Sequence, residues 1–166
     1  MVRPAEHIEE SRDSRRTLPV YSGAIVCAPE GRILCQLRDD KPGILFPGYW
    51  TCSPGGHVEP GEAPEKAIVR ELREEFEIEV TGLQPLKTLV REDGYAPGIY
   101  HSFTATLATP LDQVKCNEGQ KVDFFRPEEI RRMRIHPISM EFLETWLAGT
   151  GTDGTNLAKP IEGQPL

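Results

Sequence analysis

Between positions 64 and 78 the apolar residues recur with the period of an α-helix. At about 100° per residue, one sector of the helical wheel collects four apolar side chains: Ile68, Val69, Leu72 and Phe76. The adjacent sector, within about 60° on either side of its centre, collects three carboxylates: Glu71, Glu74 and Glu75. Arg70 lies at the margin of the acidic sector, one turn before Glu74, where the two side chains can pair. The pattern predicts an amphipathic helix with an apolar face beside an acidic face.

Five other stretches have the apolar content or the alternation of β-strands: 21–27, 32–37, 80–92, 99–107 and 121–125. The first two flank a turn signal and predict a hairpin. The third is predicted as two strand pieces interrupted around 82–85, where glycine and proline occur.

The stretch 99–107 alternates between two faces. Ile99, His101 and Phe103 share one face, whereas Tyr100 and Ser102 share the other. His101 therefore points with apolar residues, and it is either a hydrogen-bonded core histidine or a substrate contact.

Two helices are predicted toward the C-terminus. Pro127 occupies the first helical position of one, and the other, 140–147, turns four apolar side chains toward the core: Phe142, Leu143, Trp146 and Leu147. Residues 149–166 contain few apolar side chains and are predicted to form a flexible tail. Residues 1–18 are charged and predict a short surface helix or a loose arm. This arm is a candidate homodimer contact, although no residue in it argues for that role.

Composition narrows the class of protein. The chain has 166 residues, of which 38% are hydrophobic and 27% charged, as in a folded soluble domain. Its 19 basic and 26 acidic residues give a net charge of −7, which argues against binding of long nucleic acid. No stretch resembles a signal peptide or a membrane span. The cysteines lack zinc or redox spacing and predict reduced thiols in a cytoplasmic protein: Cys27, Cys35, Cys52 and Cys116.

The acidic sector has two explanations. The ordinary one is a solvated face on an amphipathic helix. Here, however, a glycine-rich turn at 53–56 enters the helix, and Glu62 lies just before it. Carboxylates crowded on adjacent turns raise one another's pKa unless a cation lies between them. Oxygen ligands of this kind suit Mg²⁺ together with a substrate phosphate, so the segment indicates metal-assisted phosphate chemistry.

The same residues resemble the Nudix box, G-x5-E-x7-R-E-U-x-E-E-x-G-U, where U is a bulky apolar residue. The chain supplies eight positions in register: Gly56, Glu62, Arg70, Glu71, Leu72, Glu74, Glu75 and Ile78. Glu77 stands where the box has its last glycine, so Glu77 either adopts a positive φ or ends the helix differently. The resemblance covers roughly 19–148 and implies an α+β Nudix fold, an α/β/α sandwich with a mixed β-sheet. It also implies hydrolysis of a nucleoside diphosphate-linked substrate with Mg²⁺ or Mn²⁺.

The resemblance assigns roles residue by residue. The implied metal ligands are Glu71, Glu74, Glu75 and a carbonyl of Gly55 or Gly56. The segment Glu118-Gly119-Gln120 resembles a MutT-type segment whose glutamate is a further ligand or base, so Glu118 joins the set. One of these carboxylates would deprotonate the attacking water, and the sequence does not decide which. Arg70 is expected to orient the glutamates, and Glu62 to pair with Arg70 or cap the turn.

Two other readings of the family resemblance stay open. Isopentenyl-diphosphate isomerase shares the fold, and the segment around Trp50 and His57 resembles its entry segment. Its reactive cysteine, however, is replaced here by Gly55, and its two upstream metal-binding histidines have no counterpart. The second alternative is a sensor that binds a nucleotide without turnover, although the complete box favours hydrolysis.

Substrate identity is less well determined. The MutT-type segment favours a (deoxy)nucleoside triphosphate. Enzymes of that type that act on oxidised guanine place an asparagine where this chain has Ser139, and a serine does not reproduce the donor and acceptor of an amide. Sugar nucleotides, ADP-ribose and dinucleotide polyphosphates stay open. Candidate substrate contacts, each with core packing or a loop role as the alternative, are Trp50, Tyr95, His101, His136 and Ser139.

Overall fold

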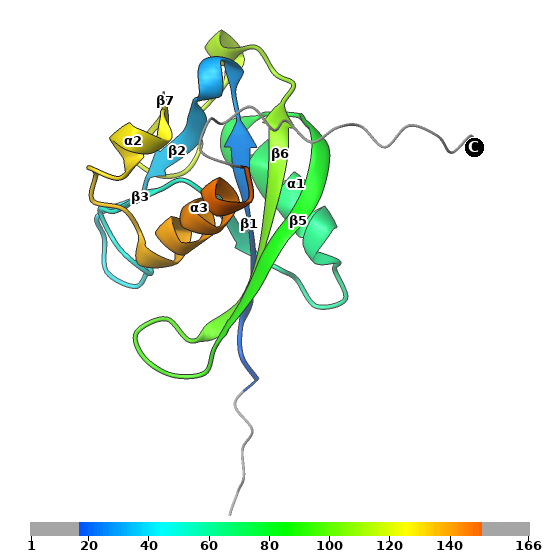
Figure 1. Ribbon diagram of the computed structural model, residues 1–166. Helices are drawn as coiled ribbons and strands as arrows, with labels where there is room; N and C mark the ends of the chain where they lie inside the picture. Colours follow the sequence, from blue (N-terminus) through cyan, green and yellow to red (C-terminus); the bar gives the residue numbers. More distant parts are fainter. Residues whose placement is uncertain (1–16, 151–166) are drawn as a thin grey trace, which may run out of the picture.

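Two parallel strands, β1 (Val20–Cys27) and β6 (Gly98–Leu107), form the centre of the sheet in the computed structural model, which describes residues 17–150. The order is β3-β2-β1-β6-β5, with β4 on β1 and β7 on β2, and these further pairings are antiparallel. The remaining strands are β2 (Ile33–Leu37), β3 (Trp50–Thr51), β4 (Gly55–His57), β5 (Val80–Arg91) and β7 (Lys121–Phe125). The sheet is mixed, as predicted (Figure 1).

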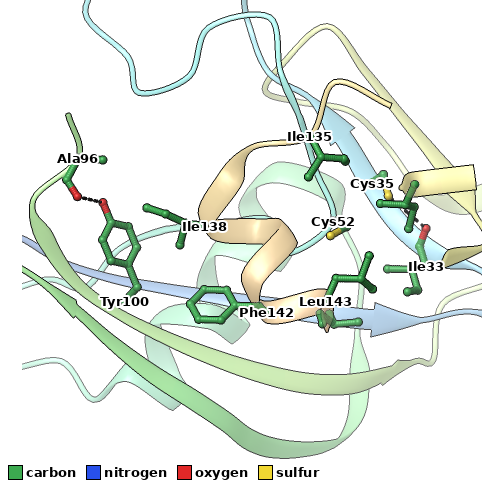
Figure 2. Close-up of a cluster of buried hydrophobic side chains, with 11 residues drawn as sticks. Ile33, Cys35, Cys52, Ala96, Tyr100, Ile135, Ile138, Phe142 and Leu143 are labelled. Atoms are coloured by element: carbon green, nitrogen blue, oxygen red, sulfur yellow. Dashed lines mark hydrogen bonds between the residues drawn. The ribbon is translucent and has the colours of Figure 1, made fainter. Parts of the chain in front are cut away.

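Helices α1 (Pro64–Phe76) and α3 (Pro137–Thr150) cover opposite faces of this sheet (Figure 1). Alternate strand residues divide between two apolar clusters, because successive side chains point to opposite faces. The cluster under α1 includes Ala24, Val26, Leu34, Ile68, Leu72 and Phe76. The cluster under α3 includes Ile25, Ile33, Cys35, Ile138, Phe142 and Leu143 (Figure 2). The predicted α+β fold with helices on both faces is confirmed.

The shorter helices connect these layers. Helix α2 (Pro127–Ile130) begins with proline as predicted. Two 3-10 turns, η1 (Pro29–Gly31) and η2 (Leu111–Gln113), follow β1 and β6. Helix α3 begins at Pro137, three residues before the predicted start, and includes the first two residues of the predicted tail. The rest of that tail, from 151, and residues 1–16 of the predicted arm lie outside the described residues.

The structure corrects one strand prediction and adds to another. Strand β5 is continuous over 12 residues, not two pieces. Its irregularity is absorbed by register shifts between Thr81 and Gln84 and between Pro85 and Lys87, as β-bulges allow. In β6, Tyr100 and Ser102 are 7% and 2% exposed, so the face opposite His101 is buried as well. Tyr100 packs in the cluster under α3, and its hydroxyl donates to the Ala96 carbonyl (Figure 2).

Helix α1 ends at the position where the sequence departs from the motif. Glu77 has φ 55° and ψ 35°, the left-handed conformation that glycine adopts at low cost. Its N–H donates to the Arg73 carbonyl at 3.0 Å and closes the last turn. Of the two expected outcomes, Glu77 therefore takes the positive φ, at a cost on the order of 1 kcal/mol.

The sequence predicts that the four cysteines are reduced residues in or near the core. All four cysteines are free thiols, although Cys116 is exposed instead of lying in or near the core. Within residues 17–150, no helix combines the length and the apolar character needed to cross a bilayer.

Candidate active site

A cleft of about 630 Å³ lies at the fork between β1 and β2. The two strands are in register at Cys27 and Ile33, while the first half of β1 pairs with β4 instead. Residues from both faces of the sheet therefore reach the cleft, whose volume is within the usual range for small-molecule sites. We call its two sides the acidic side (Glu71, Glu75 and Glu118) and the neutral side (His136, Ile138, Ser139 and Phe142).

The three box glutamates on helix α1 differ in burial. Glu75 is 7% exposed and the side chain of Glu71 is 13% exposed, and both line the cleft. The side chain of Glu74 is 61% exposed and does not line the cleft. The helical wheel places all three on one face, but the sheet and the neighbouring loops cover only the side on which Glu71 and Glu75 lie.

Arg70 holds this group together, as the resemblance implies. Its Nη1 donates to Glu71 at 2.9 Å and to Glu74 at 3.2 Å. Its Nε and Nη2 donate to the two oxygens of Glu62 at 2.9 and 3.0 Å, and Nη2 also donates to the His57 carbonyl at 3.0 Å. Glu62 in addition accepts from the Glu59 N–H at 3.0 Å, so it both pairs with Arg70 and caps the turn. These bonds lower the pKa of Glu62 to about 2.

The carboxyl end of α1 places Glu118 beside Glu75. The last carbonyls of a helix lack partners within it, and here the loop after η2 supplies them. Lys115 and Asn117 donate their N–H groups to Phe76 and Glu75 at 2.9 and 2.8 Å, and Asn117 Nδ2 donates to the Glu74 carbonyl at 3.0 Å. The loop is therefore docked on α1 just before residue 118, and Glu118 lines the cleft.

Gln36 on β2 is a site residue that the sequence interpretation missed. Its Nε2 donates to Glu75 Oε2 at 3.2 Å and to the Glu118 carbonyl at 2.9 Å, so it connects two members of the acidic side. Gln36 is 4% exposed. A buried amide needs a partner, so a glutamine in an otherwise apolar strand was the available signal.

The acidic side is electrostatically strained. Burial, with the neighbouring charges of Glu118 and Glu71, raises the pKa of Glu75 to about 8. Burial also raises the pKa of Glu71, against the lowering effect of Arg70. A divalent cation relieves this kind of crowding, so the donor set fits the implied Mg²⁺ or Mn²⁺. Within the described residues, no three acidic, histidine or cysteine side chains already converge as a preformed metal cage.

The glycine-rich segment also fits this description. Gly55 and Gly56 belong to β4, which pairs with β1, and not to the free turn that the sequence predicted. A Cβ atom on Gly56 would meet the Glu71 carboxyl group at 2.5 Å, so a larger residue there would displace that carboxylate.

Two of the predicted substrate contacts, Ser139 and His136, lie on the neutral side, and both make hydrogen bonds within the protein. The Ser139 hydroxyl accepts from the Cys52 N–H at 2.7 Å and from Thr51 Oγ1 at 3.1 Å, so it is occupied within the protein. His136 Nδ1 accepts from the Ser139 N–H at 3.3 Å, and its ring packs 4.0 Å from that of Phe46. Burial lowers the pKa of His136 to about 3, which keeps the ring neutral.

The other predicted contacts lie in three different places. His101 lines the cleft and shares a 3.0 Å hydrogen bond with Thr88 through Nδ1. The Trp50 ring packs edge-on against Phe125 and is not part of the cleft lining, so its contact with substrate stays a prediction. Tyr95 is 62% exposed and likewise lies outside the lining. His57 lines the cleft, and its ring packs 4.5 Å from that of Tyr21.

Comparisons with known proteins identify the family by sequence and the fold by structure. The sequence pattern described as NUDIX domain matches residues 17–146. A nucleoside triphosphatase, NudI, from Escherichia coli is 35% identical over 108 residues, which cover 59% of this chain and 74% of that protein. The MutT protein of Methanosarcina mazei Go1 has a TM-score of 0.68 at 21% identity, covering 80% of this chain and 94% of that one. The NUDIX domain of Shewanella oneidensis NrtR, solved with ADP ribose, has a TM-score of 0.69 at 15% identity, covering 86% and 95%.

Proposed function

The chain belongs to the NUDIX domain family of hydrolases that act on pyrophosphate bonds, and we propose that it cleaves a phosphoanhydride bond of a (deoxy)nucleoside triphosphate with Mg²⁺ or Mn²⁺. One observation carries this proposal: Glu71, Glu75 and Glu118 come from two separate segments and line one cleft. Burial raises the pKa of Glu71 and Glu75, and perturbed carboxylates gathered in a cleft are typical of functional sites.

The substrate class is supported by the relative and by the cleft. NudI, at 35% identity, is a nucleoside triphosphatase. The acidic side suits a cation with a phosphate chain, while the neutral side, with Ile138 and Phe142, suits an uncharged group such as a base. ADP-ribose stays a second candidate because the NrtR domain was solved with that molecule.

The residues that would hold the cation are the acidic side, Glu74 after release from Arg70, and a carbonyl of Gly55 or Gly56. When bound, such a cation lowers the pKa of a water molecule and neutralises phosphate oxygens. We propose that Glu71 or Glu75 accepts the proton of that water, and the hydrogen bonds that fix them to Arg70 and Gln36 support this role. Arg70 and Gln36 are positioning residues, because they act through the carboxylates that they hold.

The decisive experiment is a substrate panel with Mg²⁺, followed by phosphorus NMR of the products. The panel holds the ribo- and deoxyribonucleoside triphosphates, ADP-ribose, a sugar nucleotide and a dinucleotide polyphosphate. We expect a triphosphate to give the nucleoside monophosphate and pyrophosphate, and the reaction in ¹⁸O-labelled water to show which phosphorus was attacked. No turnover of any compound, with retained nucleotide binding, would instead identify a sensor. Isomerisation of a C5 diphosphate is the separate assay for the isomerase alternative.

We also propose a cytoplasmic location, which the thiols support. Free cysteines persist in a reducing compartment, and all four cysteines of this chain are free. We therefore place the enzyme in the cytoplasm, acting on small nucleotides and not on long nucleic acid, in keeping with its net charge of −7.

A further inference from the structure

Arg38 follows directly after β2 and reaches into the cleft. Among the described residues that line the cleft, it is the only lysine or arginine. It was not among the predicted site residues, because the polar stretch that follows β2 has the composition of an ordinary loop. Its side chain is half-buried, and a long cationic side chain is rarely buried without a partner.

The structure fixes Arg38 at three points. Its N–H donates to the Tyr49 carbonyl at 2.9 Å, and its own carbonyl accepts from Gln120 Nε2 at 2.8 Å. The guanidinium Nε donates to the Leu45 carbonyl at 2.8 Å. Arg38 is therefore held in place before any ligand arrives, which reduces the entropy cost of using it in binding.

The two terminal amino groups of Arg38 remain available. Among the described residues, they make no hydrogen bond, and no carboxylate lies within the 4.0 Å limit of an ion pair. Glu75 and Glu118 are nevertheless near enough for their charges to raise the pKa of Arg38, in opposition to burial. A gap thus separates the cation from the acidic side, too wide for direct pairing.

Building on the proposed function, we propose that Arg38 binds the phosphate chain of the substrate through its two terminal amino groups. A planar fork of N–H donors matches two oxygens of one phosphate. The acidic side repels a bare phosphate, whereas the Arg38 guanidinium, across the gap, attracts it. The phosphate chain of the substrate therefore has a fixed direction through the cleft. Arg38 is in this sense a binding residue that orients the scissile bond relative to Glu71 and Glu75.

The test uses inorganic triphosphate as a probe that has no base and no apolar part. Its binding is measured by calorimetry in the presence of Mg²⁺, with the wild type and the variants Arg38→Gln and Arg38→Lys. We expect Arg38→Gln to weaken binding about 10- to 100-fold, the range for a charge-assisted hydrogen bond. Arg38→Lys should fall in between, because it keeps the charge and loses the fork.

Two controls separate phosphate binding from other roles. Lys41→Gln removes the same charge from the loop after β2, at a side chain that is 59% exposed and pairs with Asp39, and it should bind like the wild type. Mn²⁺ binding in the absence of phosphate should be equal in the wild type and in Arg38→Gln. The proposal would be overturned if Arg38→Gln weakened Mn²⁺ binding as much as triphosphate binding, or if it left the affinity for triphosphate unchanged.

The remaining alternative is that Arg38 only holds the loop through Leu45. The loop lines the cleft with the apolar side chains of Ile44 and Leu45, which inorganic triphosphate cannot use. In that case Arg38→Gln would weaken binding of adenosine and leave binding of triphosphate intact, which would overturn the proposal.

The assay measures binding and not turnover, so its outcome is independent of hydrolysis. A wild type that binds triphosphate through Arg38 and hydrolyses nothing would refute the proposed function and keep this inference. If the wild type hydrolyses nucleotides and Arg38→Gln binds triphosphate as tightly as the wild type, the proposed function stands and this inference is refuted. A wild type that does not bind triphosphate at all would overturn the role of Arg38.

Discussion

On the acidic side of the cleft, Glu71, Glu75 and Glu118 lie together, and the pKa values of Glu71 and Glu75 are raised. On the neutral side, Ser139 is satisfied by hydrogen bonds from Thr51 and Cys52. Both sides make hydrogen bonds within the protein, yet only on the acidic side do like charges lie close together. Arg70 offsets this repulsion only in part, and a bound cation would relieve the rest. The contrast indicates that the acidic side supplies the reactive groups, whereas the neutral side supplies a rigid surface against which an uncharged group can pack.

Removing one carboxylate from the chemistry should give the largest effect. We expect Glu75→Gln and Glu74→Gln each to lower kcat about 100-fold or more, the scale for losing one strong electrostatic partner. The matched control is Glu65→Gln, which removes an exposed carboxylate from the first turn of the same helix and should keep wild-type turnover. Wild-type rates in the Glu75→Gln variant would mean that the metal site lies elsewhere in the molecule.

The same variants should differ in stability, because Glu75 is buried and Glu74 is exposed. The pKa of Glu75 is raised from 4.5 to about 8, so its contribution to stability is complete below pH 4.5 and is lost as pH rises toward 8. At pH 7, without metal, we expect Glu75→Gln to increase the free energy of unfolding by about 3 kcal/mol and Glu74→Gln to change it little. Urea denaturation measures both, and equal stability of the two variants would contradict the assignment of strain to Glu75.

The neutral side should respond to acid. Burial lowers the pKa of His136 from 6.5 to about 3, so the unfolded chain takes up the proton first and stability falls as pH drops below 6.5. At pH 5 this loss is about 2 kcal/mol. His136→Asn keeps an acceptor for the Ser139 N–H and does not titrate, so its stability should decline less between pH 7 and pH 5. Parallel urea curves for wild type and variant at both pH values would show that His136 is not the cause.

Ser139 distinguishes a structural from a substrate-binding role on the neutral side. Ser139→Ala leaves the buried Cys52 N–H without an acceptor, and we expect a loss of about 1 to 2 kcal/mol in the free energy of unfolding. Its KM should stay at the wild-type value, because the hydroxyl is already occupied. A raised KM with unchanged stability would return Ser139 to the substrate contacts.

The smallest effect tests whether the end of α1 belongs to the acidic side. Glu77→Gly removes the strain of a left-handed glutamate and should stabilise the fold by about 1 kcal/mol. It also removes the exposed 3.2 Å hydrogen bond from Asn117 Nδ2 to Glu77 Oε1, which offsets part of the gain. Turnover should be nearly unchanged, and a large loss would mean that Glu77 takes part in the site.

Much of the molecule was predictable because its signals are local. The apolar stripe of α1, the turn before β2, the proline at the start of α2 and the strand after Glu118-Gly119-Gln120 all depend on residues that are close in sequence. The pairing of Arg70 with Glu74 was predictable for the same reason, since both lie on one helix face. The error lies where tertiary contacts prevailed, since β5 stays continuous through bulges. The covering of β6 on both faces likewise has no local signal.

The sequence by itself determined the helix that carries the carboxylates, the alternation that builds a mixed sheet, and the set of acidic residues suited to a divalent cation. Only the tertiary structure decided that Glu75 is buried while Glu74 is exposed, that Gln36 joins Glu75 to the Glu118 loop, and that Arg38 faces the acidic side across a gap. The physical reason is distance along the chain. Periodicity reports which residues share a face, but burial and charge are set by what packs against that face, and here those partners are 39 to 82 residues away.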